Sequence, residues 1–368
     1  MGEVSSSDPG TGPGRLGGRD SRFIHLDMGQ RREGAVDART MVLSLDALQA
    51  PFEALYLAHY RAMREIGRHV TEPGVALVAV HVPTCSLAGR AWVAAKPGQP
   101  TALIFGRHSR ADLMVEDPGL SLRHLALVSH PPTGWEPGAM RFAVHDLRTA
   151  SAFEDERGRR LEAIVAEGPA LFSAGRHALF AFPTGDPSAW PELATDAWAM
   201  WPERVYVAER SAEPDRWRRG PHAAPRRTRD GQTLITSIPG VLRAEDRLRL
   251  DGEPSLGTLR ISTERGQRRY EIGAAAALAR GVLVGRYPRC EGADLLTDAH
   301  VSRAHVLLLR VAERVWAIDT ASTGGTSPAS RPGQPRRVIA LDEGPLVLGE
   351  HRATLEWVTP RAGDRSRS

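Results

Sequence analysis

The sequence predicts a mostly-β protein in which two all-β regions follow one amphipathic helix. Short apolar runs separated by turn residues recur over residues 71–187 and again over 253–360. The chain also contains 36 Gly and 27 Pro, a turn-rich composition that disfavours long helices. Finally, the same short motifs appear in the same order in both regions. These three observations predict two related β domains in one chain.

An apolar stripe predicts one helix over residues 42–70, before the first β region. Its members recur every three or four residues: Leu48, Phe52, Leu55, His59, Met63 and Ile66. We expect this face to pack on the adjoining β region. Residues 1–41 are rich in Gly, Ser, Asp and Arg without an apolar period, and they predict a disordered tail, as do residues 361–368.

Runs of β-forming residues predict the strands of each region. Those of the first region begin near Val75, Ala91, Thr101, Arg123, Arg141 and His177. Those of the second region begin near Gly257, Arg269, Gly281, His305, Val315, Leu346 and Ala353. Residues 188–252 between them are rich in Pro and Arg, which predicts a linker.

Length and hydropathy restrict the classes of protein to consider. A chain of 368 residues is long enough for two domains that each bury a core. No apolar run approaches the roughly 18 residues that cross a bilayer, and the N-terminus lacks the apolar core of a secretory signal. We therefore expect a cytoplasmic protein without a membrane partner.

Charge and cysteine content disfavour several other functions. The formal net charge is +4, and Lys96 is the only lysine, so nearly every cation is an arginine. The linker arginines lack an accompanying recognition helix, and we do not expect nucleic acid as a partner. Cys85 and Cys290 are far apart and show no CxxC spacing, so the sequence predicts neither a metal site nor a disulfide, and no cofactor.

Four landmarks recur in the two β regions. Each region has a Gly-Arg turn, an Ala-Asp-Leu segment, a serine followed three residues later by a histidine, and an Asp-led turn. The first region has Arg107, Ser121, His124 and Asp146, and the second has Arg286, Ser302, His305 and Asp319. The arginine-to-serine spacing is 14 residues in the first and 16 in the second. We infer two copies of one domain that differ by a two-residue loop insertion.

The second copy resembles the forkhead-associated (FHA) domains, β-sandwiches whose apical loops bind phosphothreonine peptides. The resemblance rests on four segments in the family's order: the Gly-Arg turn at 285–286, Ser-Arg-Ala-His at 302–305, Asp-Thr-Ala-Ser-Thr-Gly-Gly-Thr at 319–326 and Leu-Asp-Glu-Gly-Pro-Leu-Val-Leu-Gly at 341–349. It implies two FHA-like β-sandwiches in tandem. It also implies a non-catalytic adaptor in Ser/Thr kinase signalling that binds a phosphothreonine-containing protein, either a Ser/Thr kinase or its substrate.

The chemistry of phosphate supports the same site. A phosphate dianion is held best by guanidinium groups, hydroxyl donors and backbone N–H groups that converge from loops on a rigid sheet. The sequence offers these groups at Arg286, Ser302, Arg303 and Thr323. We expect His305 to be a buried brace that hydrogen-bonds the loops, a role that the resemblance also implies, and Gly285 to support the arginine turn.

Both copies depart from the family's pattern. The family usually has Asn after the turn threonine, and Gly324 occupies that position here. Loss of that amide removes ~1 kcal/mol of peptide contact and predicts weakened or altered peptide selectivity. The first copy keeps Arg107 and Ser121, a possible weak second site, but Leu122 replaces the polar residue and Ala150 lacks the turn hydroxyl. Docking or dimerisation is the expected role of this copy.

Three alternatives remain open from the sequence. Both copies could form a scaffold that binds proteins irrespective of phosphorylation. Ser302, His305 and Asp319 could form a hydrolase triad, although no GxSxG motif accompanies them. Threonines in the segment 233–239, such as Thr233, could be phosphorylated and occupy the pocket of the second copy in cis.

Overall fold

In the computed structural model, the described part of the chain is mostly β, as the sequence predicts. All the described residues belong to one compact unit. Within it, the structure describes residues 52–132, 140–208, 232–239, 248–249, 253, 255–274 and 276–360. The tails predicted over 1–41 and 361–368, and the first ten residues of the predicted helix, lie outside the described residues.

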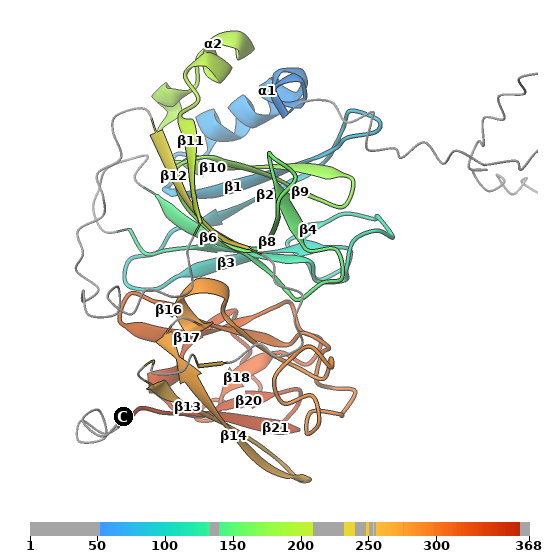
Figure 1. The fold of residues 1–368 in the computed structure, drawn as a ribbon, viewed down its shortest axis with the longest axis vertical. Coiled ribbons are helices and arrows are strands. Elements are labelled where there is room, and N and C mark those ends of the chain that lie inside the picture. The colour runs from blue at the N-terminus through green and yellow to red at the C-terminus, as the bar shows by residue number, and fades with distance from the viewer. Residues whose placement is uncertain are drawn as a thin grey trace, which may run out of the picture. The chain divides into compact units, whose positions relative to one another are not determined.

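The predicted amphipathic helix is α1 (Phe52–His69), and its apolar face packs on the first β region. Leu55 and Met63 are buried on this face against side chains of β1 (Gly74–His81) and β10 (His177–Thr184). The short helix α2 (Ala194–Ala199) lies beside α1 (Figure 1). None of the helices in the described residues combines the length and apolarity that crossing a membrane requires.

The first β region, residues 71–187, is built on one long sheet (Figure 1). Its strand order is β2-β1-β10-β9-β7-β8-β6-β5-β3-β4. Side chains from β1, β3, β5, β6, β8 and β10 meet in one apolar core, so the sheet curves over itself. The remaining bounds are β2 (Ser86–Ala94), β3 (Thr101–Gly106), β4 (Leu113–Met114), β5 (Leu125–Ser129), β6 (Arg141–Asp146), β7 (Phe153–Asp155), β8 (Arg160–Glu167), β9 (Ala170–Ala174) and the turn η2 (Pro187–Ala189).

Within the predicted linker, residues 188–252, the described residues include two strands that the sequence did not predict. Besides α2, this segment contains β11 (Glu203–Ala208) and β12 (Gln232–Pro239), which pair in parallel. Strand β12 also pairs antiparallel with β8, so it extends the sheet of the first β region. Its β-branched run buries Thr233 and Ile235 completely. Phosphorylation of Thr233 would therefore require β12 to leave the sheet, which disfavours the proposed regulation in cis at that residue.

The second β region, residues 253–360, consists of two sheets that share one apolar core. The five-stranded sheet has the order β14-β13-β21-β20-β18, and the four-stranded sheet has the order β15-β16-β17-β19. The predicted strands are present, together with the unpredicted β18 and β19. The bounds are β13 (Ser255–Thr263), β14 (Gly266–Gly273), η4 (Ala276–Arg280), β15 (Val282–Val284), β16 (Val306–Val311), β17 (Arg314–Asp319), β18 (Thr326–Pro328), β19 (Val338–Ala340), η5 (Leu341–Glu343), β20 (Leu346–Leu348) and β21 (Ala353–Val358).

Candidate functional site

Three loops of the second β region meet around Ser302. The loop after β15 is attached to it by a hydrogen bond from the Arg286 N–H to the Ser302 carbonyl oxygen (3.2 Å). The turn after β17 is attached by a hydrogen bond from the Thr323 N–H to Ser302 Oγ (2.9 Å). Ser302 itself precedes β16. The predicted residues Arg286, Ser302 and Thr323 therefore belong to one group of connected loops.

Gly285 allows the first two of these loops to approach closely. A Cβ atom at this position would lie 2.1 Å from the carbonyl oxygen of Arg303, a distance that no side chain tolerates. The close approach also allows the Tyr287 N–H to donate to that same carbonyl oxygen at 3.0 Å. A glycine is thus required where the arginine turn meets the serine loop.

His305 lies beneath the loops and is completely buried. Its Nδ1 accepts a hydrogen bond from the Ser302 N–H (2.9 Å), and its Nε2 donates to the Gly325 carbonyl oxygen (3.0 Å). Burial lowers the pKa of His305, which favours this neutral ring with one donor and one acceptor nitrogen. The imidazole thereby connects the serine loop to the turn after β17.

This arrangement does not form the hydrolase triad considered from the sequence. The ring nitrogen of His305 that faces Ser302 is bonded to the backbone N–H, whereas the Ser302 hydroxyl oxygen accepts from other groups. Asp319 uses its carboxylate on the turn itself, accepting from the Ser322 N–H (2.7 Å) and from Thr326 Oγ1 (2.8 Å). In a hydrolase triad, a ring nitrogen of the histidine takes the proton of the serine hydroxyl. Both ring nitrogens of His305 are instead bonded to backbone groups.

The predicted ligands differ in exposure. Arg286, Arg303 and Thr323 are exposed, Gly324 is half-buried, and Ser302 is 5% exposed at the base of the loops. A cleft of ≈ 340 Å³ lies beside them, and its lining includes Arg110, Thr323, Gly324, Pro335, Arg336 and Arg337. The site therefore offers two exposed guanidinium groups and one exposed hydroxyl near a cleft that three arginines help to line.

Gly324 is also fixed by its surroundings. A Cβ atom there would lie 2.6 Å from the Cα of Gly349 and 2.8 Å from the carbonyl oxygen of His300. Both neighbours are backbone atoms, which cannot move aside as a flexible side chain can. The backbone as it stands has no room for the asparagine that the resemblance leads one to expect.

Arg123, in the first β region, reaches this site, and the sequence did not single it out. Its guanidinium donates to the Ala321 carbonyl oxygen from Nη2 (2.7 Å) and Nε (3.1 Å), and Nη2 also donates to Ser302 Oγ (3.3 Å). The side chain is buried, and burial lowers its pKa. In the register of the two copies, Arg123 takes the position of Ala304. This difference between arginine and alanine was the only sign in the sequence that Arg123 has a special role.

These bonds leave one capability of the Ser302 hydroxyl unused. A hydroxyl has two acceptor lone pairs and one hydrogen to donate. The bonds from Arg123 and from the Thr323 N–H both use the oxygen as acceptor. The hydroxyl hydrogen of Ser302 is therefore available to donate to an anion.

Further contacts connect the first β region to these loops. Arg110 Nη1 donates to the carbonyl oxygens of Ser322 (3.1 Å) and Thr323 (2.6 Å), and Arg337 pairs with Asp112 at 3.2 Å. Apolar side chains of both regions share a buried cluster, which includes Ile104, Val128, Leu307, Leu309, Trp316 and Ile318. The first region thus packs directly beside the predicted site.

The corresponding loops of the first region repeat the internal hydrogen bonds. The Arg107 N–H donates to the Ser121 carbonyl oxygen (3.1 Å), and His124 Nδ1 accepts from the Ser121 N–H (3.1 Å). The exposed Arg107 side chain, however, is directed within its own loop, because its Nε donates to the Leu120 carbonyl oxygen (2.8 Å). Ala150 offers no hydroxyl at the tip of the Asp-led turn.

Comparison with known proteins gives matches among solved structures only. No family model matches the chain, and no curated protein matches it. The FHA-1 domain of the Mycobacterium tuberculosis protein Rv1747 matches with 19% identity over 30% of this chain and 98% of that chain, with a TM-score of 0.22. The FHA domain of the Chlamydia trachomatis protein CT664 matches with 17% identity over 30% and 96%, with a TM-score of 0.22. The yeast Dun1 FHA domain, solved with a doubly phosphorylated peptide derived from Rad53, matches with 13% identity over 31% and 77%, with a TM-score of 0.24.

Proposed function

We propose that the second β region, residues 253–360, binds phosphothreonine peptides and that the protein is a non-catalytic adaptor in Ser/Thr kinase signalling. The observation that supports this most strongly is the group of three connected loops around Ser302. They present Arg286, Arg303 and Thr323 to solvent, and they leave the Ser302 hydroxyl hydrogen free to donate.

Each group has a distinct role in this proposal. The guanidinium of Arg286 pairs with the phosphate, and Arg303 adds a second positive charge. Ser302 and Thr323 donate their hydroxyl hydrogens to phosphate oxygens. Hydrogen bonds to a charged group contribute about 1.5–3 kcal/mol each, enough for these groups to decide between a phosphorylated and an unphosphorylated peptide.

Peptide selectivity would come from the cleft beside the loops. Gly324 has no side-chain amide to hold the peptide backbone, so peptide selectivity would depend more on the side chains of the cleft. Arg110, Arg336 and Arg337 contribute to its lining. Arg337 pairs with Asp112 and Arg336 lies 3.8 Å from Glu343, and the positive charge that these pairs leave favours acidic peptide residues near the phosphothreonine. The partner would be a phosphothreonine-containing protein, either a Ser/Thr kinase or its substrate.

The first β region has another role in the proposal. We interpret the two regions as copies of one domain, because the landmark residues make equivalent backbone hydrogen bonds in both. In the first copy, Arg107 is engaged within its own loop, and Arg123 contacts the loops of the second copy. The first copy is thus a docking module that supports the phosphopeptide loops, rather than a second reader.

A degenerate phosphothreonine peptide library, applied to the full chain, tests this function. We expect selective retention of phosphorylated peptides, enriched in acidic residues, and loss of retention with Arg286→Ala. The unphosphorylated library is the control for peptide contacts that need no phosphate. Equal retention of both libraries, or no retention by the folded protein, would overturn the proposal.

A scaffold that acts irrespective of phosphorylation is the second candidate. It is favoured by the burial of Ser302, which is only 5% exposed, and by the direct bond between its hydroxyl and Arg123. Phosphatase treatment of partner proteins separates the two functions. The adaptor loses its partners after this treatment, whereas the scaffold recovers them equally before and after.

A further inference from the structure

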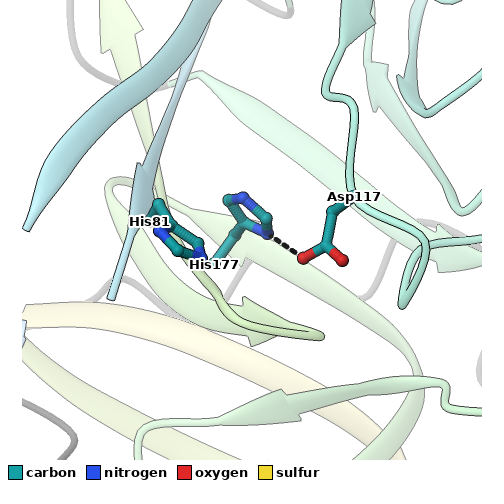
Figure 2. Close-up of side chains that lie close together, drawn as sticks. All are labelled: His81, Asp117 and His177. Carbon is teal, nitrogen blue, oxygen red and sulfur yellow. Dashed lines mark ion pairs between the residues drawn. The ribbon is translucent and has the colours of Figure 1, made fainter. Parts of the chain in front are cut away.

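Two histidines and one aspartate converge in the first β region, far from the phosphopeptide loops in sequence. His81 ends β1 and His177 begins β10, and the two are direct partners in the pairing of these strands. Their ring centroids are 5.1 Å apart. Asp117 follows β4, and Figure 2 shows His177 between His81 and Asp117. Strand pairing therefore places two imidazoles side by side, next to a carboxylate from a third segment.

The spacing of the donor atoms suits a single small cation. His177 Nδ1 lies 3.5 Å from Asp117 Oδ2, and one donor atom of each of the three residues lies within 4.8 Å of the others. Zinc-type ions bind nitrogen and oxygen at about 2.0–2.2 Å, so two ligands of a tetrahedral ion are about 3.4 Å apart. The His177–Asp117 pair already has this spacing, and a donor atom of the half-buried His81 lies within 4.8 Å of both.

Burial of an unpartnered nitrogen points to a ligand at this place. His177 is 2% exposed and Asp117 is 3% exposed. Among the described residues, no hydrogen-bond partner exists for His177 Nδ1, although it lies beside the carboxylate. A buried ring nitrogen that lacks a partner and lies 3.5 Å from a carboxylate oxygen is a candidate ligand atom.

Neighbouring groups orient the other two side chains. Thr84 Oγ1 lies 2.8 Å from His81 Nδ1, which holds the ring and leaves Nε2 as its free nitrogen. The Gly119 N–H donates to Asp117 Oδ1 at 2.8 Å, which leaves Oδ2 on the side of His177. Such supporting hydrogen bonds are typical of the residues around a metal ligand.

We propose that His81, Asp117 and His177 bind one divalent transition-metal ion of the zinc class. Two imidazoles and one carboxylate are the ligand types that such an ion takes, and three protein ligands leave the fourth position to solvent. The bound ion joins the β1–β10 pair to the loop that follows β4. Because that loop leads into Ser121, the ion would hold the base of the first copy's loops in place.

Arg176 supplies a sharp test, because it competes with the ion for Asp117. Its guanidinium donates to both carboxylate oxygens, from Nη2 at 3.3 Å and from Nε at 3.4 Å, and its side chain is 55% exposed. Binding of the ion must displace part of this interaction. Replacing the arginine with a neutral residue should therefore tighten metal binding, while a structural role for the cluster gives no such gain.

The experiment titrates the full chain, stripped with a chelator, with Co²⁺ as a spectroscopic probe, followed by competition with Zn²⁺. We expect one equivalent of Co²⁺ with visible absorption bands. Affinity should fall at least about 100-fold in His177→Gln and Asp117→Asn, and rise about 10-fold in Arg176→Gln. His351→Gln, at an exposed histidine, is the matched control and should bind as the wild type does.

Two results would overturn the proposal. The first is a wild-type protein that gives no Co²⁺ bands. The second is equal binding by the wild type and the ligand variants, which would assign the metal to surface histidines. Circular dichroism reports whether each variant folds. If Asp117→Asn does not fold, His81→Gln replaces a half-buried ligand and Arg176→Gln replaces a half-exposed residue, and both keep the test decisive.

Discussion

The two β regions use the same internal brace but differ at the tips of their loops. In each, a buried histidine accepts the N–H of the serine three residues before it, at His124 in the first region and His305 in the second. The first region has Arg123 where the second has Ala304, and it has Ala150 where the second has Thr323. The same loop framework can therefore contact the neighbouring β region or face solvent, depending on a few side chains at its tips.

The backbone supports this distinction between framework and tips. The hydrogen bond that ties the strand histidine to the Asp-led turn is equivalent in both regions: Leu147 N–H to the His124 carbonyl oxygen and Thr320 N–H to the His305 carbonyl oxygen, each 3.0 Å. The framework thus depends on backbone hydrogen bonds and on the buried histidine that both regions share, whereas the contacts made at the loop tips depend on side chains that differ between them.

The largest expected effect is loss of a brace histidine. His305→Ala leaves the Ser302 N–H and the Gly325 carbonyl oxygen unpaired, and it also opens a cavity. We expect the free energy of unfolding to fall by about 3 kcal/mol, and His124→Ala to cause a similar loss. Urea denaturation of the full chain measures both. A loss below about 1 kcal/mol in either variant would break the proposed equivalence of the two regions.

Arg123→Ala gives the first region the residue that the second region has. It removes the guanidinium bonds to the Ala321 carbonyl oxygen and to Ser302 Oγ, so we expect a loss of about 2 kcal/mol in the free energy of unfolding. The matched control is Arg303→Ala, at an exposed arginine, with an effect within about 0.5 kcal/mol. Equal effects of the two substitutions would show that the contacts of Arg123 do not stabilise the protein.

Gly324→Ala tests the closed backbone at the turn of the second region. The added Cβ meets the Cα of Gly349 and the His300 carbonyl oxygen, and we expect a loss of about 1–2 kcal/mol in thermal or urea unfolding. Ser151 is the corresponding residue of the first region, and Ser151→Ala should stay within about 0.5 kcal/mol. A neutral Gly324→Ala would show that the turn has room for a larger residue.

The last prediction concerns the pH dependence of stability and the Asp-led turn of the first region. Burial raises the pKa of Asp146 from its ordinary value of 3.8 to about 7, against opposing hydrogen bonds from Thr149. Between these values the folded state keeps a proton that the unfolded state has lost, so this group lowers stability as pH rises. Asp146→Asn should therefore lose less stability than the wild type between pH 5 and pH 8. Parallel stability curves from pH-dependent urea denaturation would contradict this.

Several features of the fold could be predicted from the sequence, because they follow from local patterns. The alternation of apolar and turn residues located most strands, and the apolar period located α1. The contacts of Arg123 could not be found in this way, since they depend on how the first region packs on the loops around Ser302. Strand β12 lies in a segment for which the sequence predicts a linker, because arginine- and proline-rich residues surround its short β-branched run.

The proposed metal ligands show more clearly that local sequence patterns do not reveal contacts made by folding. The sequence predicts no metal site, because it has no group of candidate ligands at short, regular spacing. His81 and His177 are 96 residues apart in sequence and become neighbours only through the pairing of β1 with β10. A histidine at the end of one strand and another at the start of its partner was a signal only once the strand order was known.

The most direct test of the central claim compares Arg286→Ala with Arg107→Ala in the full chain. Fluorescence anisotropy would measure the affinity of each variant for a phosphothreonine peptide selected by the wild type. We expect Arg286→Ala to weaken binding at least about 30-fold, the scale of a lost charged hydrogen bond, and Arg107→Ala to change it less than about 2-fold. Equal effects of the two substitutions, or binding that does not need the phosphate, would contradict the assignment of the two regions to different roles.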